Sequence, residues 1–119
     1  MRIIIFVWIA FVVGSCQPIF KQPPKPQNLL DENILVEIII ETLLLQEKVF
    51  SLNNQYSEHT NTIYKTLEKE IFAKYQTDSI TYYQSYDYYS KDIEHFEKIY
   101  NRVCDSLIIR RERIFSTNK

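Results

Sequence analysis

The sequence predicts an all-α fold, a small bundle of about four helices that follows a lipidated, proline-rich tether. Apolar residues recur at helical spacing from Leu29 onward. Aspartates stand where three helices would begin, at Asp31, Asp78 and Asp92, and aspartate is a favoured helix N-cap. The only glycine is Gly14, whereas all-β folds depend on glycine in their turns.

Residues 1–15 are predicted to be a secretory signal peptide of the lipoprotein type. Arg2 precedes an apolar run from Ile3 to Val13 that contains no charge and is too short for a membrane span. Val13-Gly14-Ser15-Cys16 then places two small residues before a thiol, as in a lipobox. We therefore expect Cys16 to become the mature N-terminus and to attach the protein to the membrane through lipid.

Residues 16–28 are predicted to form the lipidated tether. All four prolines of the chain lie here, and such segments prefer the extended polyproline II conformation. Gln17, not aspartate, follows Cys16, and no acidic run follows the cysteine. These features favour sorting to the outer membrane with the domain facing the periplasm.

The helical domain is predicted over residues 29–116, with a short tail at 117–119. We expect helices at 29–52, 57–75 and 79–89 and a fourth that begins after Asp92, with a turn at 53–56. The first helix is apolar nearly all round, so we expect neighbours on several sides. The apolar stripes of the second and fourth helices are Ile63, Leu67, Ile71 and Tyr75, and Phe96, Tyr100, Val103, Leu107 and Ile114.

Two stretches of the chain resemble a family of uncharacterised small lipoproteins of Bacteroidota. The first is Lys25-Pro26-Gln27-Asn28-Leu29, followed by acidic residues at Glu37 and Glu41. The second runs from Tyr75 to Val103 and includes Asp78-Ser79, Tyr82, Ser85, Tyr88-Tyr89, Asp92, Phe96 and Ile99-Tyr100. Ile93 departs from the family pattern, in which proline is expected at that position. The resemblance implies a class of protein and a cellular location, but no activity.

The composition excludes several classes of site. Without glycine after residue 14, the chain cannot form a phosphate-binding glycine loop, a dinucleotide fingerprint or a nucleophile elbow. A net charge of −1 argues against binding to nucleic acid. His59 and His95 lack partners at metal-ligand spacing and are expected on the surface, and Cys104 is expected in the core. We therefore predict no catalytic residue, no metal and no cofactor.

Four residues are candidates for binding a partner. Tyr83 and Tyr88 lie off the helical stripe of Tyr82, Tyr86 and Tyr89, so we expect them to be the more exposed members of this cluster. Glu37 and Glu41 lie one turn apart in a narrow polar band, where partial desolvation would raise a carboxyl pKa. The alternative interpretations are an amphipathic core edge for the tyrosines and, for the glutamates, a solvated or salt-bridged stripe on a mostly buried helix, which we favour.

The residues favour a non-enzymatic interaction or scaffold module of the cell envelope that binds a protein partner. The alternative is a chaperone-like periplasmic factor that holds client segments in an apolar, tyrosine-lined groove. An enzyme that uses Glu37 and Glu41 is disfavoured, because no nucleophile, metal set or cofactor loop accompanies them. The sequence leaves the partner and the oligomeric state open.

Overall fold

The computed structural model describes residues 24–52 and 58–117 and shows an all-α fold there. Four helices and no strand are present in these ranges: α2 (Glu32–Leu52), α3 (Glu58–Lys74), α4 (Ser79–Ser90) and α5 (Ile93–Thr117). The predicted fold class is thus confirmed. The predicted signal peptide, Cys16, most of the tether and the turn at 53–56 lie outside the described residues.

Three helices begin at the aspartates that the sequence predicts as N-caps. Asp31 accepts the backbone N–H of Asn33 at 2.9 Å, Asp78 accepts that of Thr81 at 2.8 Å, and Asp92 accepts that of His95 at 3.1 Å. Each bond satisfies an N–H group that the helix itself leaves unpaired. The first helix was predicted from residue 29, but Asp31 starts it three residues later, and Leu29 and Leu30 are not helical.

The end of α3 shows how the chain turns without glycine. Gln76 has a φ of 53°, the left-handed conformation that most helix ends assign to glycine. The N–H of Thr77 donates to the carbonyl of Phe72, and the N–H of Gln76 donates to that of Ala73, both at 3.0 Å. This is a Schellman motif, and it directs the chain sharply from α3 into α4.

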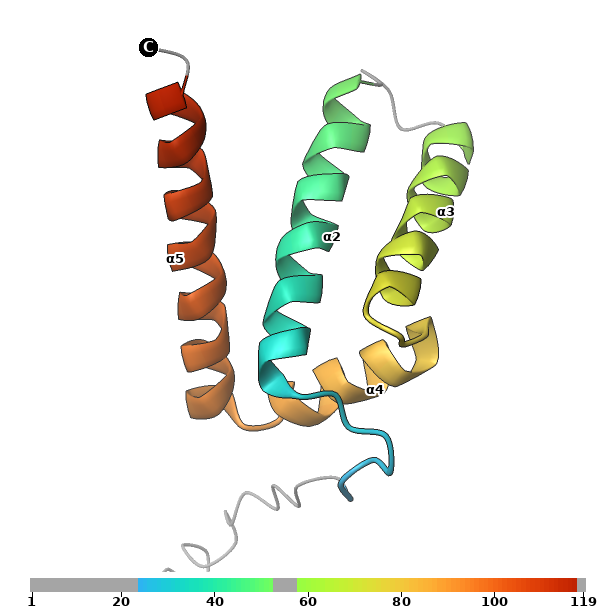
Figure 1. The fold of residues 1–119 in the computed structure, drawn as a ribbon. Coiled ribbons are helices and arrows are strands. Elements are labelled where there is room, and N and C mark those ends of the chain that lie inside the picture. Colours follow the sequence, from blue (N-terminus) through green and yellow to red (C-terminus); the bar gives the residue numbers. More distant parts are fainter. Residues whose placement is uncertain (1–23, 53–57, 118–119) are drawn as a thin grey trace, which may run out of the picture.

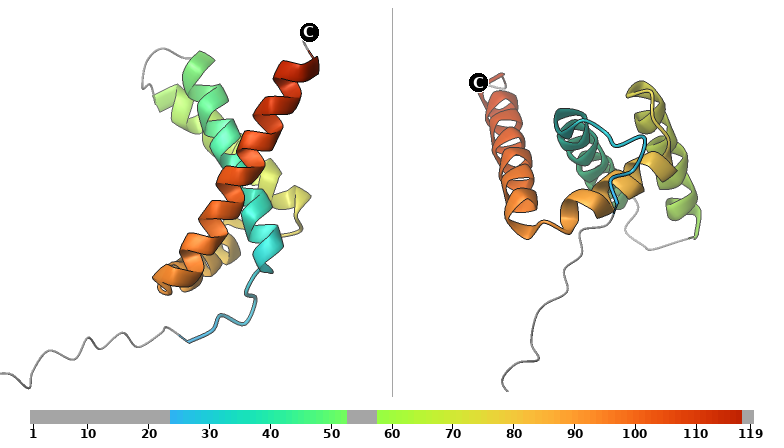
Figure 2. Two further views of the ribbon diagram at one scale, coloured as in Figure 1. Left: turned by 90° about the vertical axis from the view of Figure 1, so that its left-hand side faces the viewer. Right: turned by 90° about the horizontal axis from the view of Figure 1, so that it is seen from below.

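Helix α2 lies between α3 and α5, and α4 runs across the end of this layer (Figures 1 and 2). Among the described residues, α3 and α5 make no contact with each other. The core therefore forms where α4 closes the layer. Its fully buried side chains include Leu35, Ile38, Ile40, Phe72, Ile99 and Val103. The neighbours expected around the first helix are present, although Leu43 and Leu44 farther along α2 are 37% and 45% exposed.

The C-terminal half of α5 leaves the core, because α5 crosses α2 at an angle (Figure 2). Ile114 was predicted on the apolar stripe of this helix, but it is 62% exposed. Cys104 was predicted in the core, yet it is exposed. Val103 fills the core position, and a step of one residue turns the next side chain by about 100°.

No helix in the described part of the chain has both the length and the apolar character that crossing a bilayer requires.

Candidate functional site

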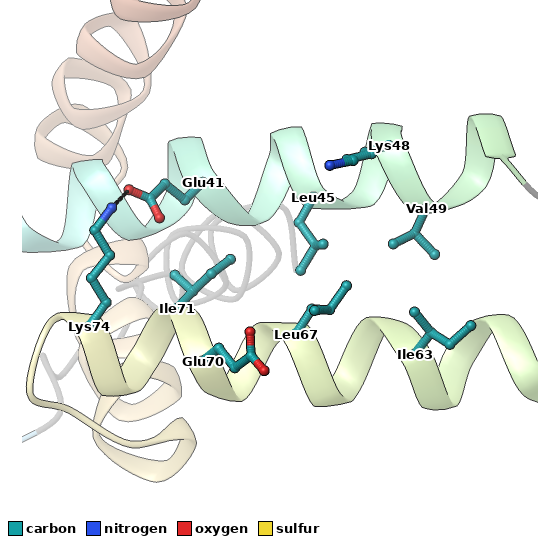
Figure 3. A pocket seen from close by; sticks show the side chains of 9 residues that line it. All are labelled: Glu41, Leu45, Lys48, Val49, Ile63, Leu67, Glu70, Ile71 and Lys74. Carbon is teal, nitrogen blue, oxygen red and sulfur yellow. Dashed lines mark hydrogen bonds and ion pairs between the residues drawn. The ribbon is translucent and has the colours of Figure 1, made fainter.

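A groove with a largely apolar lining lies between α2 and α3 (Figure 3). Its volume is about 430 Å³. The lining residues come from the second half of α2 and from most of α3: Glu41, Leu45, Lys48, Val49, Ile63, Leu67, Glu70, Ile71 and Lys74. Five of these nine side chains are aliphatic, so the groove is suited to an apolar ligand surface.

The groove exists because α2 and α3 form a single layer over this part of their length, and α4 does not cover them here. Helix α4 covers the opposite end of the layer, where the core is dense (Figure 1). Beyond it, Val49 is buried, but Leu45, Ile63, Leu67 and Ile71 remain only half-buried. The predicted stripe of the second helix thus faces α2 and leaves part of its apolar surface accessible.

A hydrogen-bonded cluster closes the groove at the end nearer the core. Glu41 accepts from the Lys74 ammonium at 2.5 Å and from the Tyr75 hydroxyl at 2.7 Å. Partial burial raises the pKa of Glu41, but these two hydrogen bonds and the charges of Lys74 and Arg110 outweigh it. The net pKa lies below the usual 4.5. The expectation of a raised carboxyl pKa is therefore wrong for Glu41, which is an ionised structural link between two helices.

The two rims of the groove carry opposite charges. Lys48 extends from α2 and Glu70 from α3, on either side of the aliphatic floor (Figure 3). Both residues are exposed, and neither forms an ion pair within the described residues. Lys48 and Glu70 were not among the predicted site residues, because their relation depends on how α2 and α3 pack.

Glu37 belongs to a different interface from Glu41, although the two lie one turn apart. Its carboxylate accepts from the Arg110 guanidinium of α5 at 2.8 Å. Glu41 is bound to α3 instead. The structure therefore supports the salt-bridged interpretation of both glutamates.

Tyr83 is 54% exposed, as the sequence predicted, but its hydroxyl is fixed. It donates to the Glu68 carboxylate at 3.1 Å, and Tyr64 donates to the same oxygen at 3.2 Å. Its ring packs edge-on against Tyr82. Burial and the Glu68 charge raise the pKa of Tyr64 to about 12. Tyr83 thus joins α4 to α3 while about half of the residue stays exposed.

Tyr88 is half-buried, in the same range of exposure as Tyr86 and Tyr89. Its ring packs edge-on against Tyr89 at 5.7 Å between centroids. Tyr88 also lines a cavity of about 480 Å³ between α4 and the start of the described chain, together with Pro24, Pro26, Gln27, Asn28, Gln84 and Asp87. The surroundings of Tyr88 are therefore largely the chain's own N-terminal segment.

The same face of α4 holds that N-terminal segment in place. The N–H of Leu30 donates to the Ser85 hydroxyl at 3.0 Å, and the Tyr89 hydroxyl donates to the Leu30 carbonyl at 2.9 Å. Tyr82 is buried against Phe72, with ring centroids 5.0 Å apart. Most of the tyrosine cluster is thus engaged in packing, and the groove is lined by aliphatic residues instead of the tyrosines expected in the chaperone hypothesis.

The histidines differ in their surroundings. His59 is exposed. His95 is half-exposed and lies 2.7 Å from the Glu32 carboxylate, which also accepts from Arg102 at 2.6 Å. In the described part of the chain, no three His, Cys, Asp or Glu side chains gather where they could hold a metal.

Comparison with known proteins adds one finding. A family model described as a domain of unknown function, DUF4296, matches residues 26–113, which is most of the chain. The chain belongs to the DUF4296 family. Searches of curated proteins and of solved structures gave no match. The DUF4296 match covers all four helices up to Arg113, and therefore both the groove and the tyrosine cluster.

Proposed function

We propose that this protein is a non-enzymatic outer-membrane lipoprotein whose periplasm-facing helical domain is an interaction module. The domain binds an apolar segment of a protein partner in the groove between α2 and α3. The lipid on Cys16 holds it at the membrane, and the tether spaces it from the bilayer.

The observation that carries this proposal is the groove itself. Its floor is aliphatic, its volume is about 430 Å³, and its rims present an exposed lysine and an exposed glutamate. Accessible apolar surface in a concave site flanked by polar groups is typical of a protein-binding groove. The Glu41–Lys74–Tyr75 cluster fixes the spacing of the two helices, so the groove is preformed.

The proposed membrane attachment rests on the lipobox-like sequence and on the family resemblance. The hydrogen bonds between Leu30 and the Ser85 and Tyr89 side chains fit this attachment, because they hold the segment just after the predicted tether on α4. A force applied through the tether would therefore act on α4 and the core, and not on the N-terminal end of α2 alone.

A chaperone-like factor is the second candidate, and the openness of the groove favours it. A floor without specific hydrogen-bonding groups accepts many apolar sequences, as client binding requires. The two candidates differ in the number of partners, because a scaffold has one defined partner whereas a chaperone has many.

A photo-crosslinking residue at Leu67 in the full chain tests the groove in intact cells. We expect one discrete adduct, and we expect none from a probe at Lys69, an exposed neighbour that does not line the groove. Leu45→Glu should abolish the adduct by placing a charge in the floor. Many adducts of different mass would favour the chaperone-like factor. No adduct at Leu67 would refute the proposal that the groove binds a protein partner.

Cys16→Ser tests the anchor separately. Labelled fatty acid should enter the wild-type protein and not the variant, which should leave the outer-membrane fraction. If the serine variant still fractionates with that membrane, the anchor assignment fails while the groove proposal stands.

A further inference from the structure

We infer that the segment that occupies the groove is the end of α5, residues 108–117, from a second copy of this chain. This inference rests on the proposed function, since it names the partner of the same groove. The starting observation is that the described part of one molecule has two apolar surfaces without a partner. One is concave, the groove between α2 and α3, and the other is convex, on α5.

The convex surface is an outward stripe on α5. Ile108 is 48% exposed and Phe115 is 69% exposed, and Cys104 on the preceding turn is also exposed. At 100° per residue, positions 104, 108 and 115 fall within about 40° of one another on the helix. We call these three residues the outer stripe of α5. They point away from the core, which Val103 and Ile99 face.

Opposite charges flank the outer stripe, as they flank the groove. On the same helical projection Arg111 lies about 60° to one side of Ile108 and Glu112 about 40° to the other. Both are exposed, and neither forms an ion pair within the described residues. The groove offers Glu70 on one rim and Lys48 on the other. One orientation of the α5 end therefore pairs Arg111 with Glu70 and Glu112 with Lys48.

The lengths also agree. The step from Ile108 to Phe115 is seven residues, about 10 Å of helix, and the step from Glu41 to Val49 along the groove is eight, about 12 Å. An amphipathic helix that lies in an apolar groove with charged rims is a common mode of peptide recognition.

The occupant must come from another molecule. Within one chain α5 is held on the far side of α2 from α3 by the Arg110–Glu37 pair (Figure 1). The contact is between two different surfaces, so it closes as a reciprocal dimer or continues as a chain of copies. Attachment of every copy to one membrane raises their local concentration and favours either assembly.

The photo-probe at Leu67 in the full chain distinguishes this inference from the proposed function. We expect an adduct of twice the chain mass in which the crosslinked peptide lies within residues 108–117. An adduct with a different protein overturns the inference and leaves the proposed function standing. No adduct overturns both.

Charge reversal tests the orientation. Glu70→Arg and Arg111→Glu should each reduce the adduct about two- to fivefold, and the double variant should restore it. Arg113→Glu is the matched control, because Arg113 is exposed but lies on another side of α5. Phe115→Glu should reduce the adduct more than tenfold without lowering the melting temperature. If Phe115→Glu keeps the adduct, or if Arg113→Glu acts like Arg111→Glu, the inference is wrong.

Discussion

At the scale of single residues, charged and polar side chains connect the helices of this protein at defined points. Glu41 links α2 to α3, Glu37 links α2 to α5, and Glu68 accepts from tyrosines of α3 and α4. A carboxylate that receives two donors is stabilised in its ionised form. The stability of the fold should therefore depend on pH through Glu41.

Glu41→Gln should lower the melting temperature by a few degrees at pH 7, and this difference should shrink as the pH falls below 4.5. The folded pKa of Glu41 lies below the unfolded value of 4.5, so its stabilisation is complete above that value. It disappears as the pH falls through the folded pKa. Melting curves at a series of pH values measure this, with Glu47→Gln, an exposed glutamate on the same helix, as control.

Gln76→Gly should stabilise the protein by about 1 kcal/mol, because a left-handed residue with a Cβ costs about that much. In a domain of this size the melting temperature should rise by roughly 4–8 °C. Gln84→Gly is the matched control: it makes the same substitution at an exposed position within α4, where glycine should destabilise by about 1 kcal/mol. A loss of stability in Gln76→Gly would contradict the role assigned to this turn.

At the scale of elements, α5 is divided into a half that is packed in the core and a half that is largely exposed. Ile99 is fully buried under α2 and α4, whereas Ile109 is 48% exposed. The division follows from the crossing of α5 over α2, beyond which the two helices separate (Figure 2).

Ile99→Ala should cost roughly 2–5 kcal/mol, because it leaves a cavity that the surrounding core cannot fill. Ile109→Ala removes the same atoms from an exposed position and should change stability by less than about 0.5 kcal/mol. Denaturant unfolding of both variants measures the difference. Equal losses would mean that the two halves of α5 are packed alike.

The helices and their starts could be predicted from the sequence, because apolar periodicity and aspartate caps are local signals. Asp31, Asp78 and Asp92 act within three residues of themselves. The groove could not be predicted in the same way. Lys48 and Glu70 line one groove only because α2 packs on α3, and Glu37 and Glu41 look alike locally but bind different helices.

The exposure of Ile114 was missed for the same reason, whereas Cys104 is exposed because the adjacent Val103 takes the core position. A helical stripe predicts which side of α5 is apolar, but not how far along its length a neighbour extends. Where α5 diverges from α2, apolar periodicity continues without burial. The self-association inferred above rests on a different side of the helix, the outer stripe of α5, which faces away from the core.

At the scale of the whole molecule, α2, α3 and α5 form a layer, and α4 packs across one end of it. This packing of α4 depends on contacts between aromatic rings. Phe72, Tyr82, Tyr86 and Phe96 form a continuous series of ring contacts from α3 through α4 to α5. Such pairs add to the burial of their apolar area. Several tyrosine side chains therefore lie where α4 packs on the other helices, and their phenol groups must remain neutral for the fold to persist.

The protein should lose stability progressively as the pH rises from about 10 to about 12. Burial raises the pKa of Tyr86 to about 12, with a further contribution from the nearby Tyr100 hydroxyl, and burial with the Glu68 charge does the same for Tyr64. Below pH 10 these phenols are neutral in both states, so the stabilisation is complete. Above it the unfolded chain loses protons first, and folding becomes less favourable until the folded phenols also ionise.

Tyr86→Phe separates this effect from packing. The variant keeps the ring that contacts Tyr82 and Phe96 and loses only a hydroxyl that lies 3.4 Å from that of Tyr100. Its melting temperature at pH 7 should stay within a few degrees of the wild type. Between pH 10 and 12 it should fall less steeply, because one fewer group changes its proton binding on unfolding. Parallel curves for the two proteins over that range would show that Tyr86 does not couple ionisation to the fold.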